Sequence, residues 1–125
     1  MQWMPHATVA AMIEDNGKFL LVEETTDRGN RFNQPAGHLE DNETLLEAVI
    51  RETLEETAYD FTPQALLGIY HWKHEHNDTT YLRFAFIGKV GAHYHAQALD
   101  DGIIRAVWMT VDEIRNQAHL MRSPQ

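Results

Sequence analysis

Three glutamates near the middle of the chain, Glu52, Glu55 and Glu56, have the residue type and spacing of a metal-binding group. On a helix, residues three and four positions apart are neighbours, so these side chains fall within an arc of roughly 100°. In a partly desolvated site, two such charges about 5 Å apart repel each other by roughly 3 kcal/mol at an effective dielectric of 20. A positive group is therefore expected beside them.

Arg51 offsets only part of this charge. On a helix it can pair with Glu47 and Glu55, which lie four residues before and after it, and this leaves Glu52 and Glu56 without a counter-charge. Carboxylate ligands in a chain without cysteine select a hard divalent cation such as Mg²⁺, Mn²⁺ or Ca²⁺. Mg²⁺ usually combines one or two carboxylates with the phosphates of a substrate. The pattern therefore indicates phosphate chemistry.

The whole chain is acidic, and the acidity is concentrated around these glutamates. Nineteen Asp and Glu residues oppose ten Lys and Arg residues, which gives a net charge of −9. Eight of the acids lie between Gly37 and Asp60, where Arg51 is the only Lys or Arg. The plain alternative is a solvated acidic helix face. Such a face would lie opposite the apolar stripe of the helix, whereas these glutamates lie at its rim.

Composition also excludes several function classes. A strongly acidic chain is a poor partner for a nucleic-acid polymer, because phosphate binding depends on Lys and Arg. The absence of cysteine excludes disulfides, thiolate metal sites and a cysteine nucleophile. No apolar run approaches the roughly 20 residues of a membrane helix, and the N-terminus has no basic leader segment. We expect a soluble, cytoplasmic protein with no membrane partner.

Local signals predict the helix that carries the glutamates. Thr44 and Glu47 have the spacing of a capping box, which places the start of the helix near Leu45 and lets it run to about Thr57. Apolar residues recur at helical spacing and are expected to face the core: Leu45, Leu46, Val49 and Ile50.

The segments before this helix read as strands. Asn16-Gly17 predicts a tight hairpin between the apolar runs His6–Ile13 and Lys18–Val22. The segment Arg31–Leu39 contains Pro35 and Gly37, which is typical of an edge strand that turns into a loop.

After the helix the pattern returns to strands, predicted at Leu66–Trp72, Tyr81–Val90 and Ile103–Met109. Lys73–Thr80 and Gly91–Gly102 are expected to be loops, and Thr110 opens a second capping box with a helix toward His119. These elements predict one α/β (α+β) domain that spans residues 1–125.

One stretch of the sequence resembles a known signature. Gly37, Glu43, Arg51, Glu52, Glu55 and Glu56 match the polar and glycine positions of the Nudix box, the 23-residue signature of the Nudix hydrolases. Two positions differ: Ala58 replaces a glycine of the family, and Thr53 replaces a residue that is usually aliphatic. The segments Asn33–Glu40, His71-Trp72 and Leu82–Phe84 are similar to the NudJ-type phosphatase branch, so the resemblance covers nearly the whole chain.

The resemblance implies a mixed β-sheet in an α/β/α sandwich and a metal-dependent hydrolysis of a phosphoanhydride bond. It implies that Glu52 and Glu56 are the main ligands of Mg²⁺ or Mn²⁺, with Glu55 and the backbone carbonyl of Ala36 as further ligands. Arg51 would orient the glutamates, and Glu43 would support the start of the helix. Such relatives continue past the position of Gln125 with another helix, so we expect truncation or a more open substrate pocket.

The general base and the substrate contacts are open at this point. The base candidates are Glu52, then Glu55, then Asp100 or Asp101 from the late loop. Arg31 and Arg83 could offset the charge of a small phosphorylated substrate, Trp72 could stack on its ring, and Gln34 could bind its edge. The expected substrate is a nucleoside di- or triphosphate or a pyrophosphate ester such as a thiamine precursor. The alternative is a silent Nudix-fold module that senses nucleotides without turnover.

Overall fold

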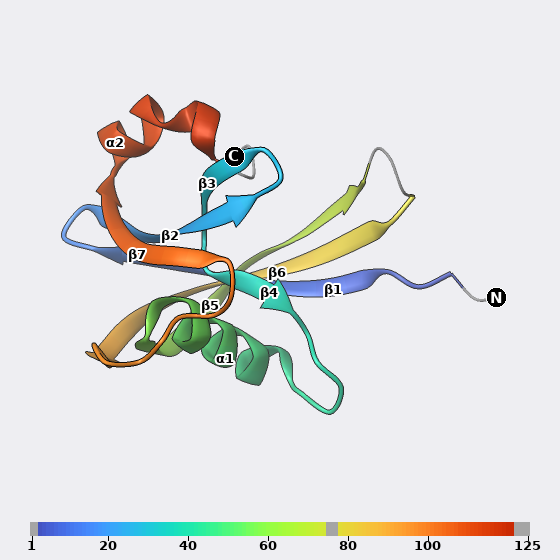
Figure 1. Ribbon diagram of the computed structural model, residues 1–125. Coiled ribbons are helices and arrows are strands. Elements are labelled where there is room, and N and C mark those ends of the chain that lie inside the picture. Colours follow the sequence, from blue (N-terminus) through green and yellow to red (C-terminus); the bar gives the residue numbers. More distant parts are fainter. Residues whose placement is uncertain (1–2, 75–77, 122–125) are drawn as a thin grey trace.

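The computed structural model describes residues 3–74 and 78–121, which form a mixed β-sheet with helices on both sides. The elements along the chain are β1 (His6–Asp15), β2 (Lys18–Thr26), β3 (Gly29–Asn33), β4 (Ala36–His38), α1 (Leu45–Thr57), β5 (Tyr59–Lys73), β6 (Thr80–His93), β7 (Ile103–Thr110), α2 (Val111–Asn116) and a 3₁₀ turn (Ala118–Leu120). Figure 1 shows α1 on one side of the strands and α2 on the other. The predicted α/β/α sandwich with a mixed sheet is confirmed.

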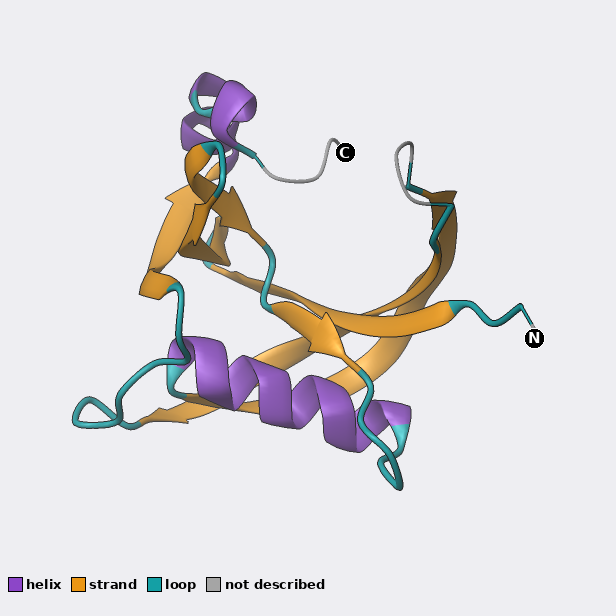
Figure 2. Ribbon diagram, turned by 45° about the vertical axis from the view of Figure 1, so that its right-hand side comes forward, coloured by secondary structure: helices purple, strands orange, loops and turns teal. Residues whose placement is uncertain are grey.

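The sheet has the strand order β3-β2-β1-β6-β5, with β4 added to β1 and β7 added to β2. β1 and β6 run parallel, and each of the other pairs is antiparallel. β1 pairs with β2 only near their shared turn, so the strands separate into two groups that splay apart in Figure 2. Among the described residues, no helix is long and apolar enough to span a bilayer.

The first hairpin forms as its sequence predicts. Asn16 and Gly17 both have positive φ, at 53° and 80°, as a tight turn of this kind requires. The Gly17 N–H also donates to the Glu14 carboxylate over 2.8 Å. The segment predicted as an edge strand is divided into β3 and β4 at Gln34-Pro35, because proline cannot donate a ladder hydrogen bond.

Helix α1 has the predicted bounds, and its capping box is complete. Thr44 accepts from the Glu47 N–H, and the Glu47 carboxylate accepts from the Thr44 N–H. At its C-terminal end Ala58 takes the left-handed conformation, with φ at 62°, and donates its N–H to the Leu54 carbonyl over 2.9 Å. The helix therefore ends as a glycine would end it, although the alanine methyl makes this conformation less favourable.

The core-facing side of α1 differs from the prediction. Ala48, Val49 and Thr53 are fully buried, and the first two pack in the core cluster with residues of the sheet, whereas Leu46 is 50% and Ile50 is 39% exposed. The prediction for Leu46 and Ile50 was wrong because helical spacing fixes only the period of the stripe. Its position around the helix is set by contacts with the sheet, mainly with β5 and also with β4 and β1.

Strand β5 is longer than predicted. It begins at Tyr59 rather than Leu66 and passes through Pro63 with irregular register at three points. An edge strand tolerates this because the N–H that proline lacks would face away from the ladder.

Thr53 and Thr57 lie one turn apart in the core and differ in the hydrogen bonds of their hydroxyl groups. The Thr57 hydroxyl donates to the Thr53 carbonyl over 2.6 Å and accepts from the Tyr59 N–H. The Thr53 hydroxyl has no hydrogen-bond partner within the part of the chain that the structure describes. A buried hydroxyl without a partner destabilises the fold.

The same substitution at these two threonines is therefore expected to have opposite effects. Thr53→Val removes an unsatisfied hydroxyl and should raise the free energy of unfolding by about 1 kcal/mol. Thr57→Val should lower it by about 1 kcal/mol, because two hydrogen bonds are lost. Urea denaturation of the two variants measures both values. Destabilisation by both substitutions would show that the Thr53 hydroxyl has a partner in solution.

Candidate active site

The described residues bring three carboxylates together at the C-terminal half of α1. Side-chain oxygens of Glu52, Glu55 and Asp100 all lie within 4.8 Å of one another. Glu52 and Glu55 come from α1, and Asp100 comes from the connection between β6 and β7, which runs beside α1 in Figure 1. The Asp100 N–H donates to the Glu55 carbonyl over 2.9 Å and so fixes the loop at this point. Asp101, the other base candidate of the loop, is exposed and is not part of this group.

Strand β4 packs closely against the side chain of Glu52. A Cβ atom at Gly37 would overlap the carboxylate of Glu52, which is only 8% exposed. Glycine is therefore required here by close approach of a side chain.

Glu56 lies one turn further along α1 and contacts the same strand. Its carboxylate accepts from the Ala36 N–H over 3.0 Å. The N–H and C=O of one residue in an extended strand point to the same side, so the Ala36 carbonyl is expected to face α1 as well. This is the carbonyl that the family resemblance offers as a metal ligand.

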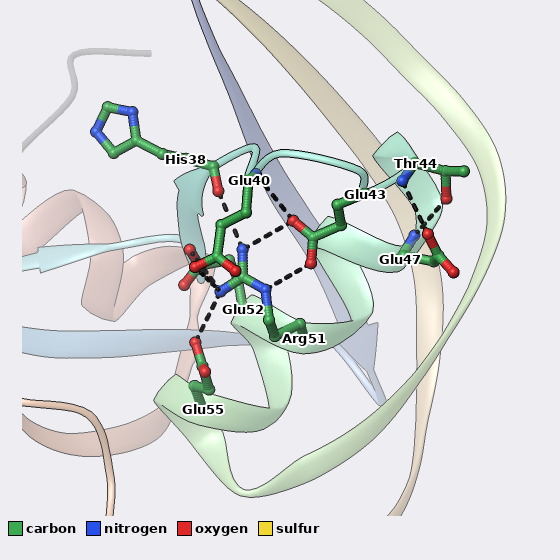
Figure 3. Close-up of polar contacts among 8 residues, drawn as sticks. All are labelled: His38, Glu40, Glu43, Thr44, Glu47, Arg51, Glu52 and Glu55. Carbon is green, nitrogen blue, oxygen red and sulfur yellow. Dashed lines mark hydrogen bonds and ion pairs between the residues drawn. The ribbon is translucent and has the colours of Figure 1, made fainter.

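Arg51 ties the acidic groups to one another, as Figure 3 shows. Its guanidinium donates to Glu43 over 2.6 and 3.0 Å, to Glu55 over 2.9 Å and to the His38 carbonyl over 3.0 Å. It also lies 3.3 Å from a Glu52 oxygen. The expected pair with Glu55 is present, but the expected pair with Glu47 is not, because the capping box holds the Glu47 carboxylate.

Burial makes the ionised form of two glutamates unfavourable. It raises the pKa of the Glu52 carboxyl to about 7, with Arg51 opposing the rise and Glu55 and Asp100 adding to it. It raises the pKa of the Glu56 carboxyl to about 8, where the Ala36 N–H opposes the rise and Glu52, Glu24 and Asp100 add to it. By contrast, the hydrogen bond from Arg51 lowers the pKa of Glu43. Arg51 therefore neutralises Glu43 more fully than it neutralises the buried pair.

These shifts predict how the stability of the metal-free protein depends on pH. Both carboxyls have an ordinary pKa of 4.5 in the unfolded chain, so above this pH the folded protein holds protons that the unfolded chain releases. Their contribution is fully present below pH 4.5 and is lost as pH rises through about 7 and 8. The free energy of unfolding should fall by several kcal/mol from about pH 5 to about pH 9, since each unit of pKa shift is worth about 1.4 kcal/mol.

Urea denaturation in a chelator, at several pH values, measures this dependence. The Glu52→Gln, Glu56→Gln double variant is the control and should show a much flatter profile. A wild-type stability that rises with pH over this range would contradict the assignment.

Two of the predicted substrate residues meet beside a hollow in the surface. Arg83 donates to the Gln34 side chain over 3.1 Å, and both residues line a hollow of about 340 Å³. Its remaining lining is largely apolar and includes Met12, Phe19, Leu21, Phe32, Val111 and Ile114. The hollow is therefore an apolar compartment with a polar edge.

The other two predicted contacts lie elsewhere. Trp72 is on β5, where its ring stacks on Tyr81 with centroids 4.8 Å apart. Arg31 is on β3, and its guanidinium donates to the neighbouring Asn30 carbonyl. Glu24 on β2 was missed by the sequence analysis, although its charge acts on Glu56. Nothing in its local pattern distinguishes it from an ordinary exposed strand residue.

Comparison with known proteins agrees with this geometry. The NUDIX domain model matches residues 4–124. Phosphatase NudJ of Escherichia coli (strain K12) is 42% identical over 120 residues, which cover 96% of this chain and 77% of that protein. A NUDIX hydrolase structure from Nitrosomonas europaea is 49% identical, with a TM-score of 0.93, and covers 97% of this chain and 82% of that one.

A more distant structure, a UDP-X diphosphatase, shares the fold at 19% identity, with a TM-score of 0.78 over 96% of this chain and 62% of that one. Since the family model covers nearly the whole chain and the close relatives align over almost all of it, this protein belongs to the Nudix hydrolase family.

Proposed function

We propose that this protein is a divalent-metal-dependent pyrophosphohydrolase that cleaves a phosphoanhydride bond in a small nucleoside di- or triphosphate or pyrophosphate ester. The observation that carries the proposal is the convergence of Glu52, Glu55 and Asp100 beside the buried Glu56. Family membership and the relation to a protein named phosphatase NudJ support the same class of reaction.

The donor set fits Mg²⁺ or Mn²⁺, because hard cations prefer oxygen ligands. Glu52, Glu55 and Glu56 would hold the cation, together with the Ala36 carbonyl, and Asp100 would face them from the loop. When bound, the cation would neutralise phosphate oxygens and make the attacking water more acidic.

The residues of the chain would then position the water and take its proton. The bond that forms joins the water oxygen to phosphorus. The bond that breaks joins phosphorus to the bridging oxygen of the anhydride, and its cleavage releases phosphate or diphosphate. The Glu55 side chain is 44% exposed and Glu52 only 11%, so Glu55, with the exposed Asp100, can pass a proton on to solvent more readily than Glu52. Arg51 would keep Glu52 and Glu55 in place through its contacts with both.

The hollow beside Gln34 and Arg83 supports a substrate with a ring at one end. Its apolar lining suits a base or another heterocycle, and Arg83 brings a positive charge to its edge. Gln34 lies two residues before Ala36, whose N–H donates to Glu56, so this segment joins the hollow to the carboxylates. A ring in the hollow would place an attached diphosphate toward the glutamates.

A substrate panel tests this proposal. Nucleoside di- and triphosphates, thiamine pyrophosphate and its pyrimidine precursor diphosphate are incubated with Mg²⁺, and phosphate and diphosphate release are measured separately. Release should stop in a chelator and in Glu56→Gln. Release that survives both would overturn the metal site. Thermal stabilisation by a nucleotide without any release would indicate a sensing module instead.

A further inference from the structure

The connection from residue 94 to residue 102, here called the strap, lies along the end of α1. The last carbonyls of a helix lack partners within the helix. The strap donates hydrogen bonds to three carbonyls at this end of the helix: the Tyr94 N–H to Ala58 over 2.8 Å, the Asp100 N–H to Glu55 over 2.9 Å, and the Gln97 side chain to Leu54 over 2.8 Å, where the Ala58 N–H donates as well. The strap therefore caps the helix that carries the glutamates.

Hydrogen bonds rather than packing hold the strap. None of its residues is buried, and Leu99 is the only one that is even partly buried. The Tyr94 hydroxyl donates to Asp60 over 2.7 Å, and the Gln97 N–H donates to the Tyr94 carbonyl over 3.0 Å. Gln97 is the one strap residue whose side chain bonds to the backbone of α1 among the described contacts.

Resting on the function proposed above, we infer that Gln97 is a positioning residue that sets the place of the Asp100 carboxylate over Glu52 and Glu55. Gln97 and Asp100 bond to the carbonyls of consecutive residues, Leu54 and Glu55, so both follow the same turn of α1. With little burial to fix the strap, loss of the Gln97 bond leaves Asp100 tied by its own N–H alone at this turn. The expected result is a weaker metal site in an otherwise intact fold.

A double-mutant cycle tests this inference, with Mn²⁺ alone as the probe. Gln97→Ala should weaken Mn²⁺ binding about tenfold, as loss of a supporting contact around a metal site typically does. It should lower kcat by a similar factor, leave KM nearly unchanged and leave Tm within about 2 °C of wild type. In an Asp100→Asn background, Gln97→Ala should have no further effect on Mn²⁺ affinity, because the carboxylate it positions is gone.

Two controls separate positioning from general damage. Gln97→Asn keeps a neutral amide donor near the Leu54 carbonyl and should retain more of the Mn²⁺ affinity than Gln97→Ala, whereas Gln64→Ala at an exposed position of β5 should change nothing. Amide hydrogen exchange at Asp100 should speed up in Gln97→Ala, whether or not the protein hydrolyses any substrate.

The inference is overturned if exchange at Asp100 is unchanged in Gln97→Ala, or if the two substitutions weaken Mn²⁺ binding independently. A wild-type protein that binds Mn²⁺ but releases no phosphate from any compound would instead overturn the proposed function. In that case the exchange and Mn²⁺ measurements still decide the role of Gln97.

Discussion

Glu52→Gln is expected to lower kcat by a factor on the order of 10³ while the protein stays folded. Glu52 is the one member of the three-carboxylate group that is buried, and it lies directly over Gly37 on β4. The amide keeps the size of the side chain and removes its negative charge. A cation held by the remaining carboxylates would then be bound more weakly and in a different place.

The variant also separates a catalytic role from a structural one. Because burial raises the pKa of Glu52 to about 7, the neutral amide should make the metal-free protein more stable near pH 8. Asp41→Asn removes one charge from the same acidic segment at an exposed position and is the matched control. Activity is followed by phosphate release, and metal affinity by Mn²⁺ titration. Equal activity in Glu52→Gln and Asp41→Asn would refute the placement of the metal.

Gly37→Ala is expected to lower activity about a hundredfold although it replaces no acidic residue. The added methyl would overlap the Glu52 carboxylate, so the side chain must leave its present position in the group with Glu55 and Asp100. A displacement of about 1 Å at a catalytic group is enough to lower a rate by this factor. Mn²⁺ affinity should fall with kcat, because the same side chain serves both.

Gly91→Ala is the control, since a Cβ at Gly91 meets no atom within 4 Å. It should leave activity unchanged. Adding Glu52→Asp to Gly37→Ala shortens the displaced side chain and should recover part of the Mn²⁺ binding. Full activity of Gly37→Ala alone would mean that Glu52 does not need its position over β4.

The parts of the fold that sequence reasoning predicted well are those fixed by local chemistry. The capping box of Thr44 and Glu47 fixes the start of α1, and Asn16-Gly17 fixes the first hairpin. The choice among partners was not local. Sequence spacing allows Arg51 to pair with Glu47, but the Glu47 carboxylate accepts from the Thr44 N–H in the capping box instead. The segment before α1 places Glu43 beside Arg51, and Glu43 takes that pairing.

The same limit applies to the candidate site. The sequence offered Asp100 and Asp101 as equal candidates, and the structure distinguishes them because the Asp100 N–H bonds to the end of α1. Glu24 reaches the neighbourhood of Glu56 only through the packing of β2 beside the other strands. Such placements depend on contacts between residues far apart in the chain, and the spacing of apolar residues along the sequence does not predict them.

The parallel pairing of β1 with β6 affects the order in which the chain can fold while the ribosome synthesises it. His6 lies opposite Tyr81, so one side of β1 has no ladder partner until a nascent chain has emerged well past residue 80. During that interval β4, which pairs with β1, and α1, which packs against it, have already been synthesised. The centre of the sheet is thus completed late in translation, and Asp100 follows later still.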